Sequence, residues 1–235
     1  MTELTVEPLT RLALDFAPRP WAFARERRDE IDAYFQRRRE RTPQLYNGRV
    51  LLLQEAVVAG DALSGTFLET DYASFLAWRD WGFPDAGVCN CFAMGALRSR
   101  DGAFVLAVMG PHTANAGRIY FAAGTPDPGD VRADGTVDLA GSIARELAEE
   151  TGLTPAAYTT EPGWSAVLAG PRIALFKLLQ ADETADELRR NVLAHLAAEP
   201  EPELAGVHIA RGPADLDPAM PPFTQAYLRH MWKLG

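Results

Sequence analysis

The stretch Arg-Glu-Leu-Ala-Glu-Glu-Thr-Gly, residues 145–152, places three glutamates within five positions, after an arginine and just before a glycine. A helix exposed to water can carry such an acidic run for solubility alone. The alternative is a site in which neighbouring carboxylates hold a cation. The rest of the chain has to decide between these two interpretations.

The acidic stretch is predicted to end a helix that spans residues 139–151. Asp138 precedes the apolar positions and suits the N-cap, where its carboxylate favours the positive helix terminus. Gly152 suits the left-handed position after the last turn, and Pro155 stops the helix from continuing.

The faces of this helix are not arranged as in a purely solubilising helix. One apolar stripe is predicted, formed by Ala140, Ile143, Ala144 and Leu147. Glu146 and Glu150 are four residues apart and stack on one side, with Glu149 beside them. At about 100° per residue, Glu150 lies only about 70° from the centre of the stripe. At least one carboxylate is therefore expected at the edge of the core.

Like charges at this spacing destabilise a helix by about 0.2–0.5 kcal/mol per pair. Arg145 can pair with Glu149 at the next turn, but Glu146 and Glu150 still face each other. A hard divalent cation such as Mg²⁺, which takes oxygen ligands, would relieve the repulsion. A solvated acidic face remains the alternative at this point.

The pattern around the acidic run resembles the Nudix box. That signature is Gly, five residues, Glu, seven residues, and then Arg-Glu-aliphatic-x-Glu-Glu-x-Gly-aliphatic. Residues 145–153 match every specified position of its second half. The stretch "YFAAGTPDPGD", residues 120–130, resembles the strand and loop that open the box, with Gly124 as its first glycine.

Two departures from the family's pattern fall between these halves. Asp130 stands where the family has Glu, and fourteen residues separate it from Arg145 where the family has seven. The simplest account is a seven-residue insertion within "VRADGTV", residues 131–137. Asp138 is the other candidate for the acid, although it lies one position too close and capping suffices for it. In the family this acid orients the box arginine, so the departure puts the support of Arg145 in question.

The resemblance implies an α+β fold, a Nudix α/β/α sandwich with a mixed β-sheet, over residues 86–235. A small N-terminal α/β extension is expected over residues 1–85. Helices are predicted over residues 21–41 and 72–82, and strands on either side of Gly60-Asp61, Arg100-Gly102 and Gly170-Pro171. A further strand is predicted at residues 118–124. Helices near 184–198 and 222–234 and a strand near 204–210 complete the chain. The irregular order of strands and helices argues against a doubly wound parallel sheet.

The resemblance also implies Mg²⁺-dependent hydrolysis of a nucleoside diphosphate linked to another group, with Mn²⁺ as a substitute cofactor. The implied metal ligands are Glu146, Glu149, Glu150, the backbone carbonyl of Ala123 and a later acid, for which Glu203 is preferred over Glu201. The cation would neutralise the diphosphate oxygens and lower the pKa of the attacking water. Catalytic roles fall to Glu146 as the preferred general base, to Glu149 and to Arg145, although family members differ in which glutamate is the base.

Substrate recognition is predicted from arginines and from a short similarity. Arg49, Arg98 and Arg118 are candidates for binding phosphate, because the guanidinium group forks onto phosphate oxygens. Residues 45–54 and 65–79 look like the N-terminal part of Nudix enzymes that hydrolyse UDP-sugars. A nucleotide sugar is therefore the favoured substrate.

A second function class is a Nudix-fold regulator that binds a nucleotide without hydrolysing it. Such domains usually lose box glutamates, whereas this chain keeps all three in the helix, which favours catalysis. A third possibility is an interaction protein with a solvated acidic helix.

The composition of the chain limits which binding partners and which cellular compartment can be expected. The net charge of −9, from 32 acidic and 23 basic residues, argues against a nucleic-acid partner. No apolar stretch is long enough to span a bilayer, and the first residues do not resemble a secretory signal. Cys89 and Cys91 are expected to be reduced and packed in the core. The expectation is a cytoplasmic enzyme acting on a small molecule, with a homodimer by analogy to relatives.

Overall fold

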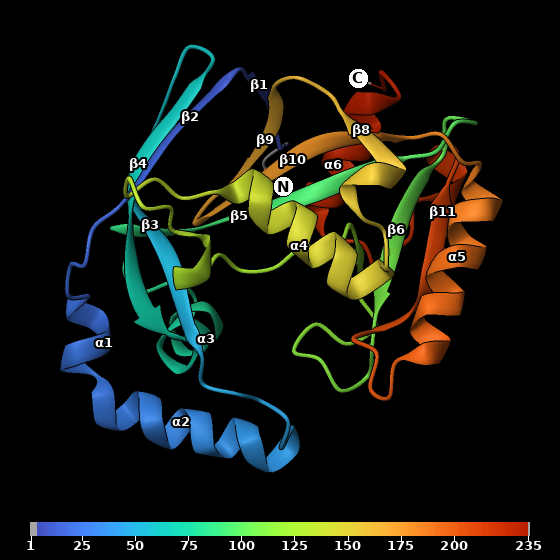
Figure 1. Cartoon of the computed structure of the whole chain (residues 1–235). Coiled ribbons are helices and arrows are strands. Elements are labelled where there is room, and N and C mark those ends of the chain that lie inside the picture. The colour runs from blue at the N-terminus through green and yellow to red at the C-terminus, as the bar shows by residue number, and fades with distance from the viewer. Residues whose placement is uncertain (1–3, 235) are drawn as a thin grey trace.

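The computed structural model describes residues 4–234, which build an 11-stranded mixed β-sheet with helices on both of its faces (Figure 1). The main path of the sheet runs β1-β9-β10-β5-β3-β4-β2, and β6, β7, β8 and β11 branch from it. The strands are β1 Val6–Leu9, β2 Arg11–Phe16, β3 Arg49–Ala59, β4 Ala62–Asp71, β5 Val88–Arg98, β6 Phe104–Met109, β7 Ile119–Tyr120, β8 Tyr158–Thr160, β9 Trp164–Ala169, β10 Arg172–Ala181 and β11 Leu204–Ala210.

The helices cover the sheet from opposite sides. They are α1 Ala22–Glu26, α2 Arg28–Arg41, α3 Tyr72–Asp80, α4 Leu139–Thr151, α5 Ala185–Ala198 and α6 Pro222–Met231. Apolar residues of α4 and α5 share one core cluster with Ala93 and Leu97 of β5. Residues of α6 belong to a second core cluster, together with Met94 and Ala96 of β5. Met94 and Ala96 lie on the face of β5 opposite to Ala93 and Leu97. The predicted α/β/α sandwich is thereby confirmed.

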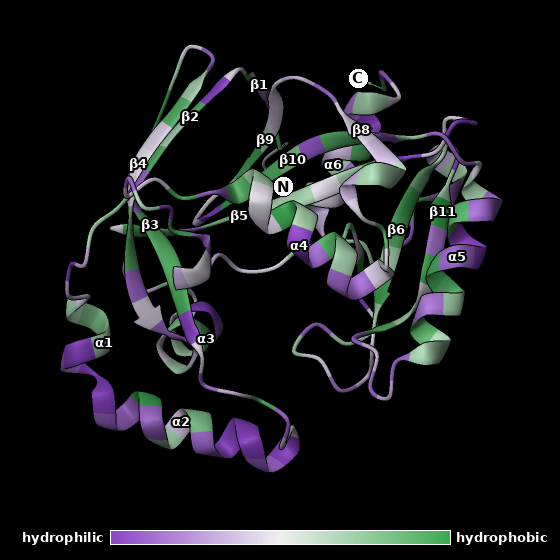
Figure 2. Ribbon diagram, viewed as in Figure 1, coloured by the Kyte–Doolittle hydropathy of each residue, from purple (hydrophilic) through white to green (hydrophobic). Residues whose placement is uncertain are grey.

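The first part of the chain has an apolar cluster of its own but also extends the main sheet. Its helices α1, α2 and α3 pack around Trp21, Phe35 and Trp78. Two strand pairings join it to the rest, β1 with β9 and β3 with β5. Figure 2 shows that α2 consists largely of hydrophilic residues, while the central strands are mostly hydrophobic. A domain boundary near residue 85 remains a prediction.

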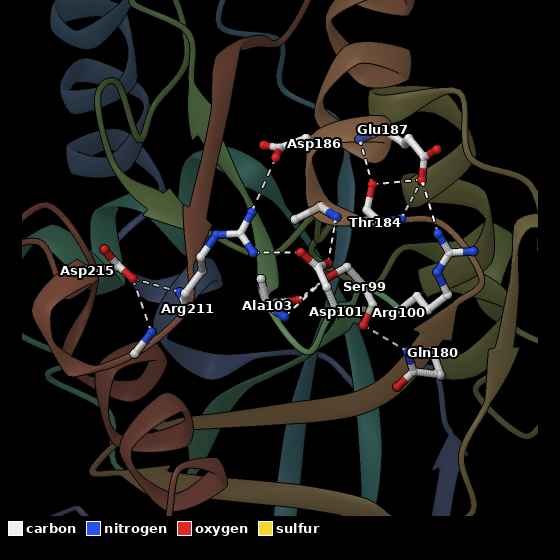
Figure 3. Close-up of polar contacts among 12 residues, drawn as sticks. Ser99, Arg100, Asp101, Ala103, Gln180, Thr184, Asp186, Glu187, Arg211 and Asp215 are labelled. Atoms are coloured by element: carbon white, nitrogen blue, oxygen red, sulfur yellow. Dashed lines mark hydrogen bonds and ion pairs between the residues drawn. The ribbon is translucent and has the colours of Figure 1, made fainter.

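A polar network fastens one end of the β5–β6 hairpin to the C-terminal elements (Figure 3). The Asp101 carboxylate accepts hydrogen bonds from the Ala185 backbone amide at 2.9 Å and from Arg211 at 2.6 Å. Arg211 also lies 3.5 Å from Asp186. This network fixes the start of α5 and the end of β11 against the hairpin predicted at Arg100-Gly102.

Most predicted elements occur where the sequence indicates them, with three differences. The predicted helix over residues 21–41 is divided at Arg27 into α1 and α2. The strand predicted at residues 118–124 shortens to Ile119–Tyr120, because the backbone then turns into the loop that opens the box. The short strands β1 and β2 were not predicted, whereas β8 and β9 both lie within the strand predicted before Gly170-Pro171. None of the helices within residues 4–234 has the length and apolar character that a bilayer-spanning segment needs.

Candidate metal-binding and active site

Helix α4 begins and ends where the sequence predicts. The Asp138 carboxylate accepts a hydrogen bond from the Gly141 amide at 2.8 Å, as an N-cap does. At the other end Gly152 adopts a left-handed conformation, with φ 74°. These two residues set the length of the helix and therefore the orientation of its glutamates.

The apolar face of α4 is displaced from the predicted stripe. Leu139, Ile143 and Leu147 are buried, whereas Ala140 is exposed and Ala144 is only partly buried. The prediction was wrong at Ala140 because the larger Leu139 side chain fills the core instead. The displacement brings Glu150 fully into the buried face, where the residue is only 8% exposed. The expectation of a carboxylate at the edge of the core is confirmed.

Arg145 is supported by Asp130, so the question raised by the departure from the Nudix pattern is answered. Its Nη2 lies 2.9 Å from the Asp130 Oδ1, and the Asp130 side chain is almost completely buried. Ser142 donates a second hydrogen bond to Asp130, at 3.1 Å. The same guanidinium contacts Glu146 at 2.6 Å and Glu149 at 3.7 Å. Arg145 therefore links the loop to two of the three glutamates.

The additional residues 131–137 form a small hairpin that returns the chain to its starting point. Val131 and Val137 face each other in an antiparallel bridge, and the Asp138 amide donates to the Asp130 carbonyl at 2.8 Å. The hairpin contacts β2, where the Val137 amide donates a hydrogen bond to the Leu14 carbonyl at 2.9 Å. The insertion thus lengthens the loop and leaves Asp130 beside Arg145.

Glu146 and Glu149 pair with Arg145, whereas the Glu150 carboxylate has no cationic partner among residues 4–234. The Glu150 Oε2 is buried and has no hydrogen-bond partner within residues 4–234. Burial, followed by the charges of Glu203 and Glu146, raises the pKa of Glu150 to about 9. Burial also raises the pKa of Glu146, although Arg145 opposes the shift. An unpartnered buried carboxylate facing two further acids fits the donor set of a hard cation.

Gly124 and Ala123 lie directly against the glutamates. A Cβ atom added at Gly124 would lie 2.5 Å from both Cδ and Oε1 of Glu146. The Ala123 backbone contacts the Glu150 carboxylate and opposes the rise of its pKa. A side chain at position 124 would therefore displace Glu146, which explains the glycine in physical terms.

The side chains of Glu146, Glu149 and Glu150 do not point toward one common position. No group of three His, Cys, Asp or Glu residues within residues 4–234 could hold a metal ion as it stands. Glu146 is turned toward Arg145, and the Glu149 side chain is 63% exposed. Binding of a cation requires these two side chains to rotate toward Glu150, which their partial exposure allows.

A cleft runs from the glutamates along the loop that opens the box. Its smaller part, about 370 Å³, is lined by Glu146, Glu150, Glu201 and Glu203 among other residues. Its larger part, about 610 Å³, shares Ala123, Gly124 and Thr125 with the smaller one. Both acids considered for the later metal ligand are therefore present in the cleft. Of these two acids, Glu203 is the one whose charge is among the main causes of the raised pKa of Glu150, which favours Glu203 over Glu201.

One of the three predicted phosphate-binding arginines lines the cleft. Arg118 lies in the larger part. Arg49 instead pairs with Glu69 at 2.5 Å, and Arg98 donates to Gln180 at 2.7 Å and lines a separate cavity. The structure therefore does not bring Arg49 and Arg98 to the site.

Two arginines that were not predicted, Arg79 and Arg172, also line the larger part of the cleft. Arg79 follows Tyr72 and Phe75 on one face of α3, a spacing visible in the sequence. Arg172 begins β10 beside Asn90 of β5, a pairing of strands distant in sequence that no local signal reveals.

Comparisons with known proteins give similarity at the level of structure. The chain matches no protein-family model and no curated protein sequence. A Nudix hydrolase from M. smegmatis, RenU, aligns with 61% of this chain and 83% of its own, at 15% identity and a TM-score of 0.39.

Two other solved structures are similar over part of the chain. The E. coli ORF135 protein covers 62% of this chain and 91% of its own, at 18% identity and a TM-score of 0.38. A variant of the Bacillus subtilis pyrophosphohydrolase BsRppH covers 50% of this chain and 60% of its own, at 15% identity and a TM-score of 0.28. At these values the function has to be argued from the site itself.

Proposed function

We propose that this chain is a Nudix hydrolase, a Mg²⁺-dependent diphosphatase that cleaves a nucleoside diphosphate linked to another group. The observation that carries the proposal is Glu150, a buried carboxylate with an unpartnered oxygen, which lines one cavity together with Glu146 and Glu203. A solvated acidic face would not bury one of its carboxylates against two others.

Glu146, Glu149, Glu150, Glu203 and the Ala123 carbonyl are the groups that would hold Mg²⁺, or Mn²⁺ in its place. When bound, the cation would neutralise the diphosphate oxygens and lower the pKa of the attacking water. The oxygen donors present suit either ion.

The protein's own residues supply position and proton transfer. Arg145, anchored by Asp130, contacts both Glu146 and Glu149 and so keeps the two glutamates near the loop at Gly124. Glu146 accepts the proton of the attacking water on a carboxylate oxygen. Burial raises its pKa, which is the direction that a general base working near neutrality needs.

The larger part of the cleft receives the rest of the substrate. Arg118 is the predicted arginine that remains available there to bind phosphate. Residues 45–54 and 65–79, which look like part of UDP-sugar hydrolases, contribute Leu45, Tyr46 and Tyr72 to the cleft walls. This supports a nucleotide sugar or similar compound as the substrate. Cytoplasmic location, a homodimer and the absence of nucleic-acid or membrane partners complete the proposal.

The test is a screen of nucleoside diphosphate derivatives for release of nucleoside monophosphate in Mg²⁺. Wild type is compared with Glu149→Gln, with Glu150→Gln and with Glu26→Gln, an exposed control on α1 that does not line the cleft. Each box variant should lose at least about 100-fold in rate, the scale of losing one electrostatic stabiliser. Near-normal rates in both would refute the site. Binding without turnover on the whole panel would favour the regulator instead.

A further inference from the structure

The far end of the larger cavity is built by the N-terminal part of the chain. Tyr72, Phe75 and Arg79 of α3 are spaced three and four residues apart, so they lie on one face of that helix, and all three line the cavity. Asn90 and Arg172, which are register partners on β5 and β10, line it too. These elements place two arginines and an amide around a common space.

The cavity is cationic in a chain whose overall charge is negative. Arg79, Arg118 and Arg172 line it, and no aspartate or glutamate is among its described lining residues. The acids of the cleft line the smaller part instead. The two parts therefore separate the cation-binding carboxylates from a region suited to an anion.

Arg172 has no anionic partner of its own. Its guanidinium stacks over the Phe83 ring, 4.6 Å from the ring centre. Within the described residues its side chain makes no hydrogen bond or ion pair, although it is partly buried. Burial, and then the nearby Arg79 guanidinium, lowers the pKa of Arg172. A partly buried guanidinium next to another one is unfavourable unless an anion joins them.

Arg79 and Asn90 have unused hydrogen-bonding capacity on the same cavity. The Nε of Arg79 donates to Asp80 at 2.8 Å, and its two Nη groups have no hydrogen-bond partner among residues 4–234. Asn90 is 9% exposed, and its buried Oδ1 is unpartnered. If the Asn90 amide is turned over, its N–H groups become available to a bound anion.

We propose that Arg79, Arg172 and Asn90 form an anion subsite that binds a carboxylate or phosphate of the substrate other than the diphosphate to be cleaved. The preferred substrate is then a nucleoside diphosphate derivative that carries a third anionic group. Cleavage of that substrate rests on the proposed function, whereas its selective binding does not. The N-terminal segment acquires a role as well, because it supplies Arg79 and completes the cavity.

The experiment uses substrate pairs that differ in one anionic group. UDP-glucuronate and UDP-glucose differ by a carboxylate, and NADP⁺ and NAD⁺ differ by a phosphate. Binding is measured by calorimetry without Mg²⁺, and hydrolysis is measured with Mg²⁺. The variants are Arg79→Gln, Arg172→Gln and Arg190→Gln, an exposed control arginine on α5. Thermal unfolding checks that each variant is folded, and Arg79→Gln serves alone if loss of the Phe83 contact unfolds Arg172→Gln.

Wild type should bind the anionic member of at least one pair about 10-fold more tightly, as expected for a charged hydrogen-bonded group. The pair that shows this preference identifies the group as carboxylate or phosphate. Each cavity variant should reduce the preference to about 2-fold or less, and Arg190→Gln should keep it.

Equal binding within both pairs by wild type would overturn the subsite. So would variants that weaken both members of a pair equally, because the arginines would then bind the diphosphate itself. A selective preference without any turnover would keep the subsite and refute the hydrolase. Hydrolysis of these compounds without any preference for the anionic member would keep the hydrolase and refute the subsite.

Discussion

At the scale of single residues, the site depends on a carboxylate in a position that usually holds an apolar side chain. Glu150 follows Leu147 by one helical turn on the buried face of α4, and its Oε2 has no partner among residues 4–234. Such a group destabilises the metal-free protein and is stabilised by a cation.

Glu150→Gln should therefore stabilise the metal-free protein near neutral pH. In the folded protein the pKa of Glu150 is raised to about 9 from its ordinary 4.5, so between these values the folded state holds more protons than the unfolded state. The stability that Glu150 contributes when protonated is lost as pH rises through this window, while glutamine does not titrate. In chelator the variant should melt at least about 2 °C above wild type at about pH 8, with a smaller gap at about pH 5.

Differential scanning calorimetry across pH measures this gap. A variant that is less stable at every pH would mean that Glu150 is satisfied without a cation.

Gly124→Ala tests the close approach between the loop and Glu146. The added Cβ would meet the Glu146 carboxylate at 2.5 Å, so the side chain must leave its position. Hydrolysis should fall at least about 10-fold, since small displacements of a catalytic group are costly. Steady-state kinetics measures the loss, with Gly206→Ala as the control because a Cβ there meets nothing within 4 Å. Equal rates in the two variants would contradict the placement of Glu146.

At the scale of elements, helix α4 could be predicted almost completely and the loop before it only in part. Asp138 and Gly152 fix the helix ends through local capping, which sequence spacing reveals. The insertion at residues 131–137 could be counted, but its closure required the contacts of Val137 and Asp130 with other backbone groups. Asp130 could be aligned with the family's glutamate, yet only its burial beside Arg145 shows how the shorter acid supports the arginine.

Gly152→Ala should destabilise the protein by about 1–2 kcal/mol, the cost of a left-handed conformation for an L-residue. The φ of Gly152 is 74°, and an added Cβ would also lie 2.9 Å from the His195 ring. Urea unfolding measures the free energy. Gly206→Ala should lie close to wild type in the same assay, and an equal effect of the two substitutions would show that the end of α4 is not held by this conformation.

Asp130→Asn should weaken the support of Arg145 and leave the helix ends unchanged. The amide keeps a similar size but loses the charge that faces the guanidinium at 2.9 Å. We expect a loss of about 1–3 kcal/mol in unfolding free energy, together with reduced turnover. Asp130→Glu, which restores the family residue and the charge, should retain more of both. If the two substitutions have equal effects, charge is not what Asp130 supplies.

At the scale of the whole molecule, the cleft depends on parts of the chain that are far apart in sequence. Arg49 and Arg98 were predicted from residue type alone, and their own partners, Glu69 and Gln180, hold them elsewhere. Arg172 reaches the cleft through the parallel pairing of β10 with β5, which residue type cannot reveal. Residue types could therefore predict the glutamates of the site. The full set of arginines that line the cleft could be found only from the way the strands pair in the sheet.

The continuous sheet predicts that the chain unfolds in one transition. Strands β1 and β3 hydrogen-bond to β9 and β5, so the N-terminal part cannot leave without opening the main sheet. Trp21, Trp78 and Trp81 report on the N-terminal cluster by fluorescence once Trp164 and Trp232 are replaced by phenylalanine, and far-ultraviolet circular dichroism reports on the whole chain. The two urea transitions should coincide. An earlier fluorescence transition would instead show that residues 1–85 unfold as a separate domain.

The most direct test of the central claim is a titration of the protein with Mn²⁺, followed by the electron paramagnetic resonance signal of the free ion. Wild type should bind Mn²⁺, and Mg²⁺ should compete for it. Glu150→Gln should weaken binding at least about 10-fold, the scale on which lost ligand support lowers metal affinity, and the exposed control Glu26→Gln should bind as wild type does. Equal affinity of wild type and Glu150→Gln for Mn²⁺, or no binding by either, would contradict the claim that the glutamates of α4 form a cation site.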